Sequence, residues 1–220
     1  MSATFTAAML EEAKACQLQI DLFRATFGES VAVTVARARK VSDQFDWGCA
    51  TRFLDGARGD PGAMGPPTNQ DDAWVAANNT VKHFLAIQYE IEHDAGANPD
   101  RIDPYATGAA LSGVQQVAAG LADKGITTRG APNWSPNAAA SSFGTLIPTG
   151  GTPIANGIVY VKGCYDVSRQ TATFSNGSPA PVSSTRVFPV EFSVEYVADA
   201  KSWMVNNSQS IQGQKGAPTC

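Results

Sequence analysis

The two histidines are the side chains best suited to acid–base chemistry, and their positions argue against a catalytic pair. His83 and His93 both fall in residues 71–93, a stretch with the apolar periodicity of a helix. His83 lies off the apolar stripe of that helix, so we expect it on the solvated surface. His93 ends the helix beside Glu92, and no histidine or cysteine pair has the spacing of a metal site. The sequence therefore predicts no catalytic residue, no metal and no cofactor.

Motifs for nucleophilic catalysis and phosphate binding are also missing. No Gly-x-Ser-x-Gly elbow follows a strand, and the Gly-rich segment lacks the Lys-Ser/Thr of a phosphate-binding loop. Gln88 and Glu92 remain as ligand-pocket candidates, because both fall on the apolar stripe of the 71–93 helix. Polar residues on such a stripe mark either a pocket or the place where the helix face meets water.

Composition narrows the classes of partner. The chain has 220 residues, of which 43% are hydrophobic and 16% charged, with a net charge of −4. Apart from Arg37, Arg39 and Lys40 there is no basic cluster, so a nucleic-acid partner is not expected. No apolar run approaches the ~20 residues of a membrane span. Residues 1–9 also lack the features of a signal peptide.

The strand-forming sequence is concentrated in residues 156–220. Alternation in residues 186–198 predicts a strand with one apolar face and with Glu191 and Glu195 on the wet face. The apolar face comprises Phe188, Val190, Phe192, Val194 and Tyr196. A turn at residues 199–201, a strand over residues 201–211 and further strands over residues 157–167 and 171–174 complete an antiparallel meander.

Helices are predicted before these strands. Residues 71–93 and 105–124 form the two clearest helices, with Trp74 among the core residues of the first and Val117 among those of the second. Residues 1–55 form a small helical hairpin module, and residues 56–70 form a Gly/Pro-rich linker. The apolar stripe from Met9 to Phe27 is too large for two helices to bury alone, so we expect this module to bind a protein partner or self-associate. A strand is predicted to start near Ile126, and the rest of residues 127–157 is interpreted as a long surface excursion.

The order of these elements, together with three short motifs, resembles a known superfamily. The motifs are Asp103-Pro-Tyr-Ala-Thr-Gly-Ala-Ala-Leu111, Gly163-Cys-Tyr-Asp-Val-Ser168 and Trp203-Met-Val205 with a cysteine at residue 220. Residues 71–220 resemble the nuclear transport factor two superfamily, also called SnoaL-like, and in particular small exported proteins of actinobacteria and their phages. The resemblance implies an α+β fold in which a cone-shaped, curved antiparallel sheet packs on helices.

The resemblance also bears on the cysteines. It favours a disulfide between Cys164 and Cys220, since the segment before Cys220 has no other anchor. The alternative is a free Cys164, because the absence of a signal peptide favours a reducing compartment. Localisation thus stays open among virion, extracellular space and cytoplasm. Cys16 and Cys49 fit an apolar face as free thiols, and the alternative is a second bridge between them across the helical hairpin.

Three functions follow from this sequence. The first is a non-catalytic interaction or structural protein, such as a phage virion protein or actinobacterial accessory protein, in which the helical module attaches and the cone domain is displayed. The second is a small-ligand-binding cone. The third is a SnoaL-type enzyme such as a cyclase, isomerase or dehydratase. A cone filled by its own aromatic side chains, with the apolar stripe of the helical module buried on another chain, favours the first function. A dry apolar pocket favours the second, and a buried carboxylate or histidine inside the cone favours the third.

Overall fold

The computed structural model describes two compact units of the chain. They are Met1–Asp60 and Pro61–Cys220, and their boundary falls inside the predicted linker. The described residues are 4–8, 24–25, 28–32 and 65–220.

The first unit is described only in short pieces. There β1 (Thr4–Thr6) pairs antiparallel with β2 (Ser30–Ala32), which the helical-hairpin prediction did not include. Gly28 has a φ of 76°, and its N–H donates a hydrogen bond to the Arg24 carbonyl, as expected of a residue that ends a helix. The remainder of the predicted module, including the Met9–Phe27 stripe, lies outside the described residues.

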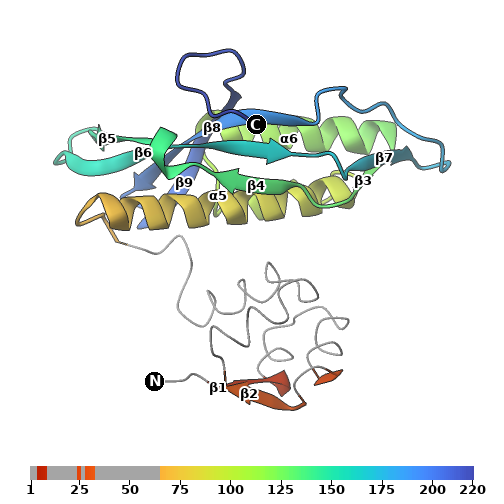
Figure 1. Ribbon diagram of the computed structural model, residues 1–220, viewed down its shortest axis with the longest axis horizontal. Helices are drawn as coiled ribbons and strands as arrows, with labels where there is room; N and C mark the ends of the chain where they lie inside the picture. The colour runs from red at the N-terminus through yellow and green to blue at the C-terminus, as the bar shows by residue number, and fades with distance from the viewer. Residues whose placement is uncertain (1–3, 9–23, 26–27, 33–64) are drawn as a thin grey trace. The chain divides into compact units, whose positions relative to one another are not determined.

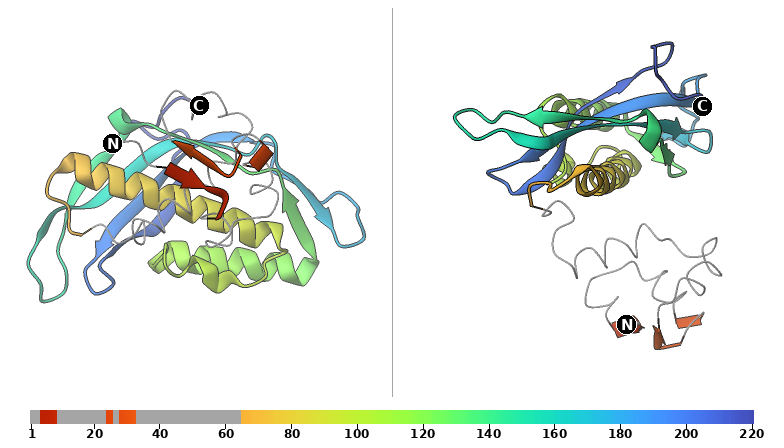
Figure 2. Two further views of the ribbon diagram at one scale, coloured as in Figure 1. Left: turned by 90° about the horizontal axis from the view of Figure 1, so that it is seen from below. Right: turned by 60° about the vertical axis from the view of Figure 1, so that its left-hand side comes forward.

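The second unit is a curved antiparallel sheet packed on two helices, which confirms the predicted α+β fold (Figure 1). The helices are α5 (Gln70–His93) and α6 (Gly108–Lys124), and the 3-10 turn η1 (Pro99–Ile102) joins them. Both helices cover the same face of the sheet (Figure 2). The opposite face carries the polar residues of the strands, so the unit has two layers.

Seven strands follow the helices. They are β3 (Ile126–Arg129), β4 (Asn133–Pro136), β5 (Ser142–Leu146), β6 (Ile154–Asp166), β7 (Thr171–Phe174), β8 (Val187–Val197) and β9 (Ser202–Ser210). The main sheet has the order β4-β6-β8-β9, and β5 pairs with the same edge of β6 as β4 does. The predicted meander is therefore confirmed in β6, β8 and β9. The prediction for β7 was wrong in one respect, because β7 pairs with β3 in a separate two-stranded sheet.

The prediction that residues 127–157 form a surface excursion is wrong. This segment supplies most of β3, all of β4 and β5, and the 3-10 turn η2 (Ala138–Ala140) between the last two. Trp134 and Phe143 face the helices and pack against the core. The strands are short and interrupted by prolines and glycines, so their pairing with the long strand β6 decides their conformation.

Helix α5 lies along the sheet and buries the predicted stripe. Its start is fixed by Asn69, whose side chain accepts a hydrogen bond from the Asp72 N–H. Ala77, Val81, Phe84, Leu85 and Ile91 are buried. Trp74 was predicted to be core, but it is only partly buried and packs against the core from outside.

Helix α6 begins three residues later than predicted, because the preceding segment pairs with the sheet. The Val205 N–H donates to the Tyr105 carbonyl at 2.8 Å, and the Thr107 N–H donates to the Val205 carbonyl at 2.9 Å. The helix then buries a narrow stripe of Ala110, Val114 and Ala118. Val117 was predicted on this inner side and is 47% exposed, which corrects the assignment.

The core lies between α5 and the meander. Phe192 pairs across the sheet with Val161, and Val194 with Val159, and all four are buried. On the outer face, Glu191 forms an ion pair with Lys162 at 3.5 Å, and the Asn206 side chain donates to Glu195 at 2.7 Å. The predicted alternation of apolar and wet faces in this strand is thus confirmed.

Candidate functional site

The two pocket candidates lie side by side on the last turns of α5. The Gln88 Nε2 donates a hydrogen bond to the Glu92 Oε1 at 2.9 Å. The spacing of four residues brings the side chains together on one helix face. Both residues are partly buried, so a pocket and a helix face that meets water both remain interpretations of this pair.

A small hollow of about 170 Å³ opens beside Gln88. Its lining residues come from α5, β6, β8 and β9. They are Leu85, Gln88, Tyr165, Phe188, Val190, Phe192, Ser208, Gln209 and Ser210. The hollow is therefore apolar on the side of β8 and polar on the sides of α5 and β9.

A β-bulge in β9 explains the polar wall. Ser193 pairs with Asn207 while the next residue, Val194, pairs with Val205, so Asn206 is an extra residue in β9. Beyond the bulge, Ser208 lies opposite Phe192 and Ser210 lies opposite Val190. The bulge thus brings Ser208 and Ser210, instead of Asn207 and Gln209, to the core side of β9. The sequence analysis did not identify Ser208, Ser210 or Tyr165, because the bulge and the convergence of strands are set by pairing.

The electrostatics of this corner favour neutral groups. Burial raises the pKa of Glu92 above its ordinary value, and the hydrogen bond from Gln88 opposes this only in part. Burial also raises the pKa of Tyr165, and the negative charge of Glu92 adds to the shift. Tyr165 therefore stays a neutral phenol that can donate a hydrogen bond, and Glu92 is a carboxyl group that can accept one.

Aromatic side chains fill most of the remaining space between the sheet and α5. Phe192 makes edge-to-face contacts with Trp134, at a centroid distance of 5.1 Å, and with Phe84 at 6.0 Å. Tyr165 and Phe188 form a similar pair at 5.8 Å. Sites for drug-sized ligands usually occupy roughly 300–1,000 Å³. The hollow is smaller than that, so it has room only for water or a very small molecule.

His83 is not on the solvated surface, which corrects the sequence prediction. It is buried, and its ring stacks on Tyr105 at a centroid distance of 5.7 Å. Its face of α5 is covered by the Tyr105–Thr107 segment that pairs with β9, a contact between parts of the chain that helix periodicity does not reveal. The position is off the hollow, since His83 is not among the lining residues.

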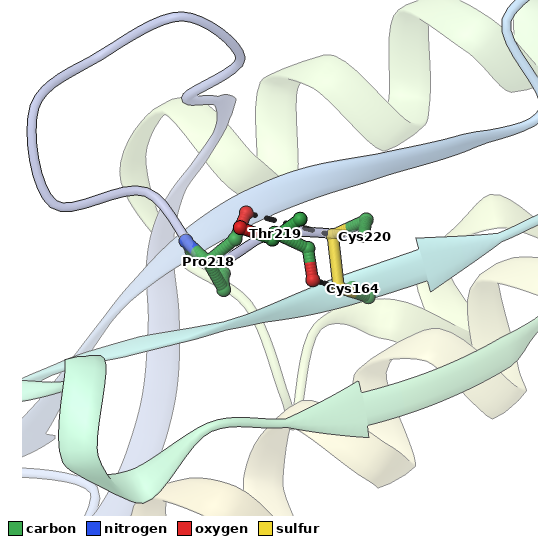
Figure 3. Close-up of a disulfide and its surroundings, with 4 residues drawn as sticks. All are labelled: Cys164, Pro218, Thr219 and Cys220. Carbon is green, nitrogen blue, oxygen red and sulfur yellow. Dashed lines mark hydrogen bonds between the residues drawn. A yellow bond between two sulfur atoms is a disulfide. The ribbon is translucent and has the colours of Figure 1, made fainter.

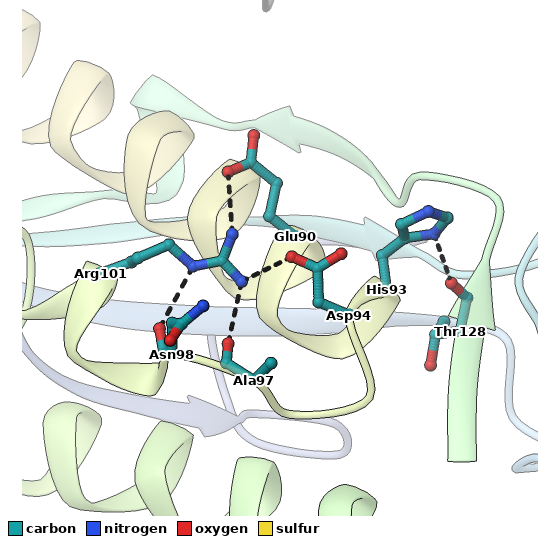
Figure 4. A network of polar contacts seen from close by, with 7 residues as sticks. All are labelled: Glu90, His93, Asp94, Ala97, Asn98, Arg101 and Thr128. Atoms are coloured by element: carbon teal, nitrogen blue, oxygen red, sulfur yellow. Dashed lines mark hydrogen bonds and ion pairs between the residues drawn. The ribbon is translucent and has the colours of Figure 1, made fainter. Parts of the chain in front are cut away.

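His93 and Arg101 hold the C-terminal end of α5 in place (Figure 4). The His93 Nδ1 lies 3.0 Å from the Thr128 carbonyl oxygen on β3. The Arg101 guanidinium donates to Asp94 at 2.8 Å and to the Ala97 and Asn98 carbonyls, and it lies 4.0 Å from Glu90. These contacts tie the helix to η1 and to the small β3–β7 sheet, and so they steady the wall that carries Glu92.

The predicted disulfide between Cys164 and Cys220 is present, with Cα atoms 5.5 Å apart (Figure 3). Cys164 lies on the outer face of β6, opposite Pro189 of β8. The Ile211 N–H extends the β8–β9 ladder by donating to the Pro189 carbonyl, and the chain after it turns back toward β6 to reach Cys220 (Figure 3). The Cys164 Sγ also lies 3.7 Å from the Thr219 carbonyl oxygen. The bridge thus fixes the C-terminal segment across two central strands.

Across the described parts of the chain, no three His, Cys, Asp or Glu residues are grouped closely enough to hold a metal ion. None of the helices described here has the length and apolar character needed to cross a membrane.

The fold and site define a two-layer α+β domain with a closed aromatic core and a disulfide-anchored C-terminal segment. Comparison with protein-family models and with curated proteins finds no match. Among solved structures, this chain is similar to the intermembrane-space region of the chloroplast protein ARC6, with a TM-score of 0.42 and 13% sequence identity. The match covers 66% of this chain and 98% of that chain.

Proposed function

We propose that this chain is a non-catalytic interaction protein in which residues 61–220 form the displayed domain. The observation that carries the proposal is the filled core. Phe84, Trp134 and Phe192 occupy the space between sheet and helix where an enzyme of the SnoaL-like superfamily would enclose its substrate. A domain that keeps this space closed presents its outer surface and its edges to other molecules.

The disulfide supports a setting outside reducing compartments. Disulfides persist in secreted and surface proteins and on virions, and they are rare in the cytosol. The Cys164–Cys220 bridge, together with the resemblance to exported actinobacterial and phage proteins, favours a virion or extracellular accessory role. Residues 1–55 are the proposed attachment module, on the basis of the apolar Met9–Phe27 stripe in the sequence.

The closed core can be tested by titrating the full chain with a library of drug-sized ligands while recording methyl NMR spectra. We expect no ligand to shift the methyl resonances of Val159, Val161 and Val194, which are buried on the helix-facing side of the sheet. The Phe192→Ala variant is the control, since it opens space at this place. Saturable binding of a drug-sized ligand at these valines in the wild-type chain would overturn the proposal.

The attachment role is tested separately by sedimentation of the full chain and of residues 61–220, the unit that contains the whole described core. The full chain should form a larger assembly, alone or with its partner. If both proteins form assemblies of the same mass when extract from the native source is added, residues 1–55 are excluded as the attachment module.

A second candidate function, binding of a very small polar ligand, is favoured by Gln88 and Tyr165, which line the hollow. Glu92 is not a lining residue, but it accepts a hydrogen bond from Gln88 and so orients its side chain. The phenol of Tyr165 and the amide of Gln88 would pair with a ligand that offers a hydrogen-bond donor and an acceptor, such as a short-chain alcohol or amide. The test is a fragment titration of wild type against Gln88→Leu. A saturable shift of Tyr165 and Ser208 resonances that is lost in the variant would support binding through Gln88, and the absence of any saturable shift in wild type would exclude binding.

A further inference from the structure

The two edges of the main sheet differ in how far their backbone groups are hydrogen-bonded to other segments. The edge at β9 is covered in its middle, because Tyr105 and Thr107 exchange backbone hydrogen bonds with Val205. At the other edge, β5 pairs with β6 on one side, and no other strand in the described part of the chain pairs with its second side. The outward-facing backbone groups of β5 are therefore a template for another strand.

Soluble proteins usually protect such an edge with charges, prolines or a covering element. Here the sequence has no charged residue between Arg129 and Lys162, a stretch that includes β4, β5 and the first half of β6. β4, on the same edge, ends in Pro136, which cannot donate to a further strand. β5 has only an irregularity between Gly144 and Leu146. The edge is thus blocked along β4 and left open along β5.

An exposed apolar side chain stands at the end of this open edge. Ile147 follows β5 directly and is 74% exposed, the highest value among the exposed large hydrophobic residues of the described chain. The other end of β5 is preceded by η2, in which Ala138 and Ala139 are exposed. The hairpin that carries Ile147 projects from the end of the domain (Figure 2), so it is accessible within this unit.

We propose that β5 is a dimerisation edge, which pairs antiparallel with β5 of a second copy of this chain about a two-fold axis near Gly144. In that arrangement, the residue that follows β5 in one copy lies beside the residues that precede β5 in the other. Ile147 is then covered by the Ala138–Ala140 turn of the second copy, twice per dimer. The two sheets join into one continuous sheet across the interface.

A second copy fits this edge better than an unrelated strand for two reasons. The edge is uncharged, so two identical copies meet without the like-charge repulsion that would arise between copies of a charged edge. The exposed Ile147 side chain and the small apolar residues of the Ala138–Ala140 turn lie at opposite ends of the same strand. A two-fold axis requires this arrangement, because it places each end of one copy beside the other end of the second copy. This interface is independent of residues 1–55, and so it goes beyond the proposed function.

The interface is short, because β5 spans only Ser142–Leu146. Interfaces of this size fall in the weak, transient class. We therefore expect a weak dimer that forms as the protein concentration rises and dissociates on dilution.

The test uses full-length protein in sedimentation velocity over a hundredfold range of concentration. Ile147→Lys places a charge on the edge, and Val182→Lys is the matched control, since Val182 is 51% exposed on a loop away from β5. Both sites are exposed, so neither change should unfold the domain. We expect wild type and Val182→Lys to gain mass equally as the concentration rises, and Ile147→Lys to keep at every concentration the mass that wild type has at the lowest.

Hydrogen exchange locates the contact in the same samples. In wild type, the amides of Ser142–Leu146 should exchange faster after dilution, because the dimer dissociates. In Ile147→Lys, the same amides should exchange at the rate of diluted wild type at every concentration. The proposal is overturned if wild type is monomeric throughout, or if Ile147→Lys keeps the wild-type mass. The second result would assign self-association to another surface such as residues 1–55. Deletion of residues 1–60 separates the two interfaces. If the shortened protein no longer attaches but still forms the Ile147-dependent dimer, this interface is distinct from the proposed attachment module.

Discussion

Phe192→Ala is the sharpest test of the closed core. Phe192 is buried and its ring touches both Phe84 and Trp134 edge to face. Removal of a buried phenylalanine side chain costs about 3–5 kcal/mol, which combines the lost transfer free energy with the cavity left behind. Phe192 also lines the hollow next to Gln88. The new space would join that hollow and could admit water through its polar wall, so we expect a loss near the lower limit, about 3 kcal/mol.

The measurement is urea unfolding followed by tryptophan fluorescence in a Trp47→Phe background. The three remaining tryptophans, Trp74, Trp134 and Trp203, then all report on residues 61–220. Val187→Ala is the control, because Val187 is on the same strand but 43% exposed. The control should lose less than about 0.5 kcal/mol. A loss below about 1 kcal/mol for Phe192→Ala would mean that this ring does not sustain the core, and the closed-core argument would fail.

Three further predictions address the bridge, the buried carboxyl and the helix contact. Replacing Cys164 and Cys220 by serine should lower the free energy of unfolding by roughly 4 kcal/mol from the chain entropy of the loop, and an unchanged urea midpoint would contradict this. Because the pKa of Glu92 is raised in the folded state, its stabilising effect is complete below the ordinary glutamate pKa and is lost as pH rises through the raised value. The stability of Glu92→Gln relative to wild type should therefore increase as pH rises above the ordinary glutamate pKa of 4.5, and parallel pH curves would refute the burial of this group. At Gly96, with a φ of 80°, a Cβ atom would lie 2.0 Å from the Ala118 carbonyl oxygen. Gly96→Ala should destabilise by at least ~2 kcal/mol, whereas Gly213→Ala, at a φ of 78° with open space around it, should show only the ~1 kcal/mol of backbone strain.

Much of the fold could be predicted because β6 and β8 are long and alternate regularly, as does β9 up to its bulge. Their pattern is local, so the face of Phe192 and the outward position of Glu191 could be read without knowing the neighbours. The helix stripes were predicted for the same reason. Gln88 and Glu92 were identified because they interrupt an apolar helix stripe, and this interruption is visible in the sequence alone.

The missed features all depend on pairing between distant segments. β4 and β5 have little strand pattern of their own and are held by β6. His83 is buried by Tyr105, more than twenty positions further along the chain. The serine wall of the hollow exists because of an extra residue in β9. None of these contacts changes the local hydrophobic period, and so periodicity could not reveal them.

The Cys164–Cys220 bridge also sets how the domain would carry a mechanical load. Tension applied at or beyond Cys220 enters the sheet at Cys164 in β6, because the covalent bridge bypasses the chain between them. β8 and β9 lie within that bypassed loop and would bear none of the pull, even though β9 is an edge strand that could otherwise peel away. An oxidised domain should therefore lengthen on forced unfolding by far less than its residue count allows, and a reducing solution should restore the missing extension.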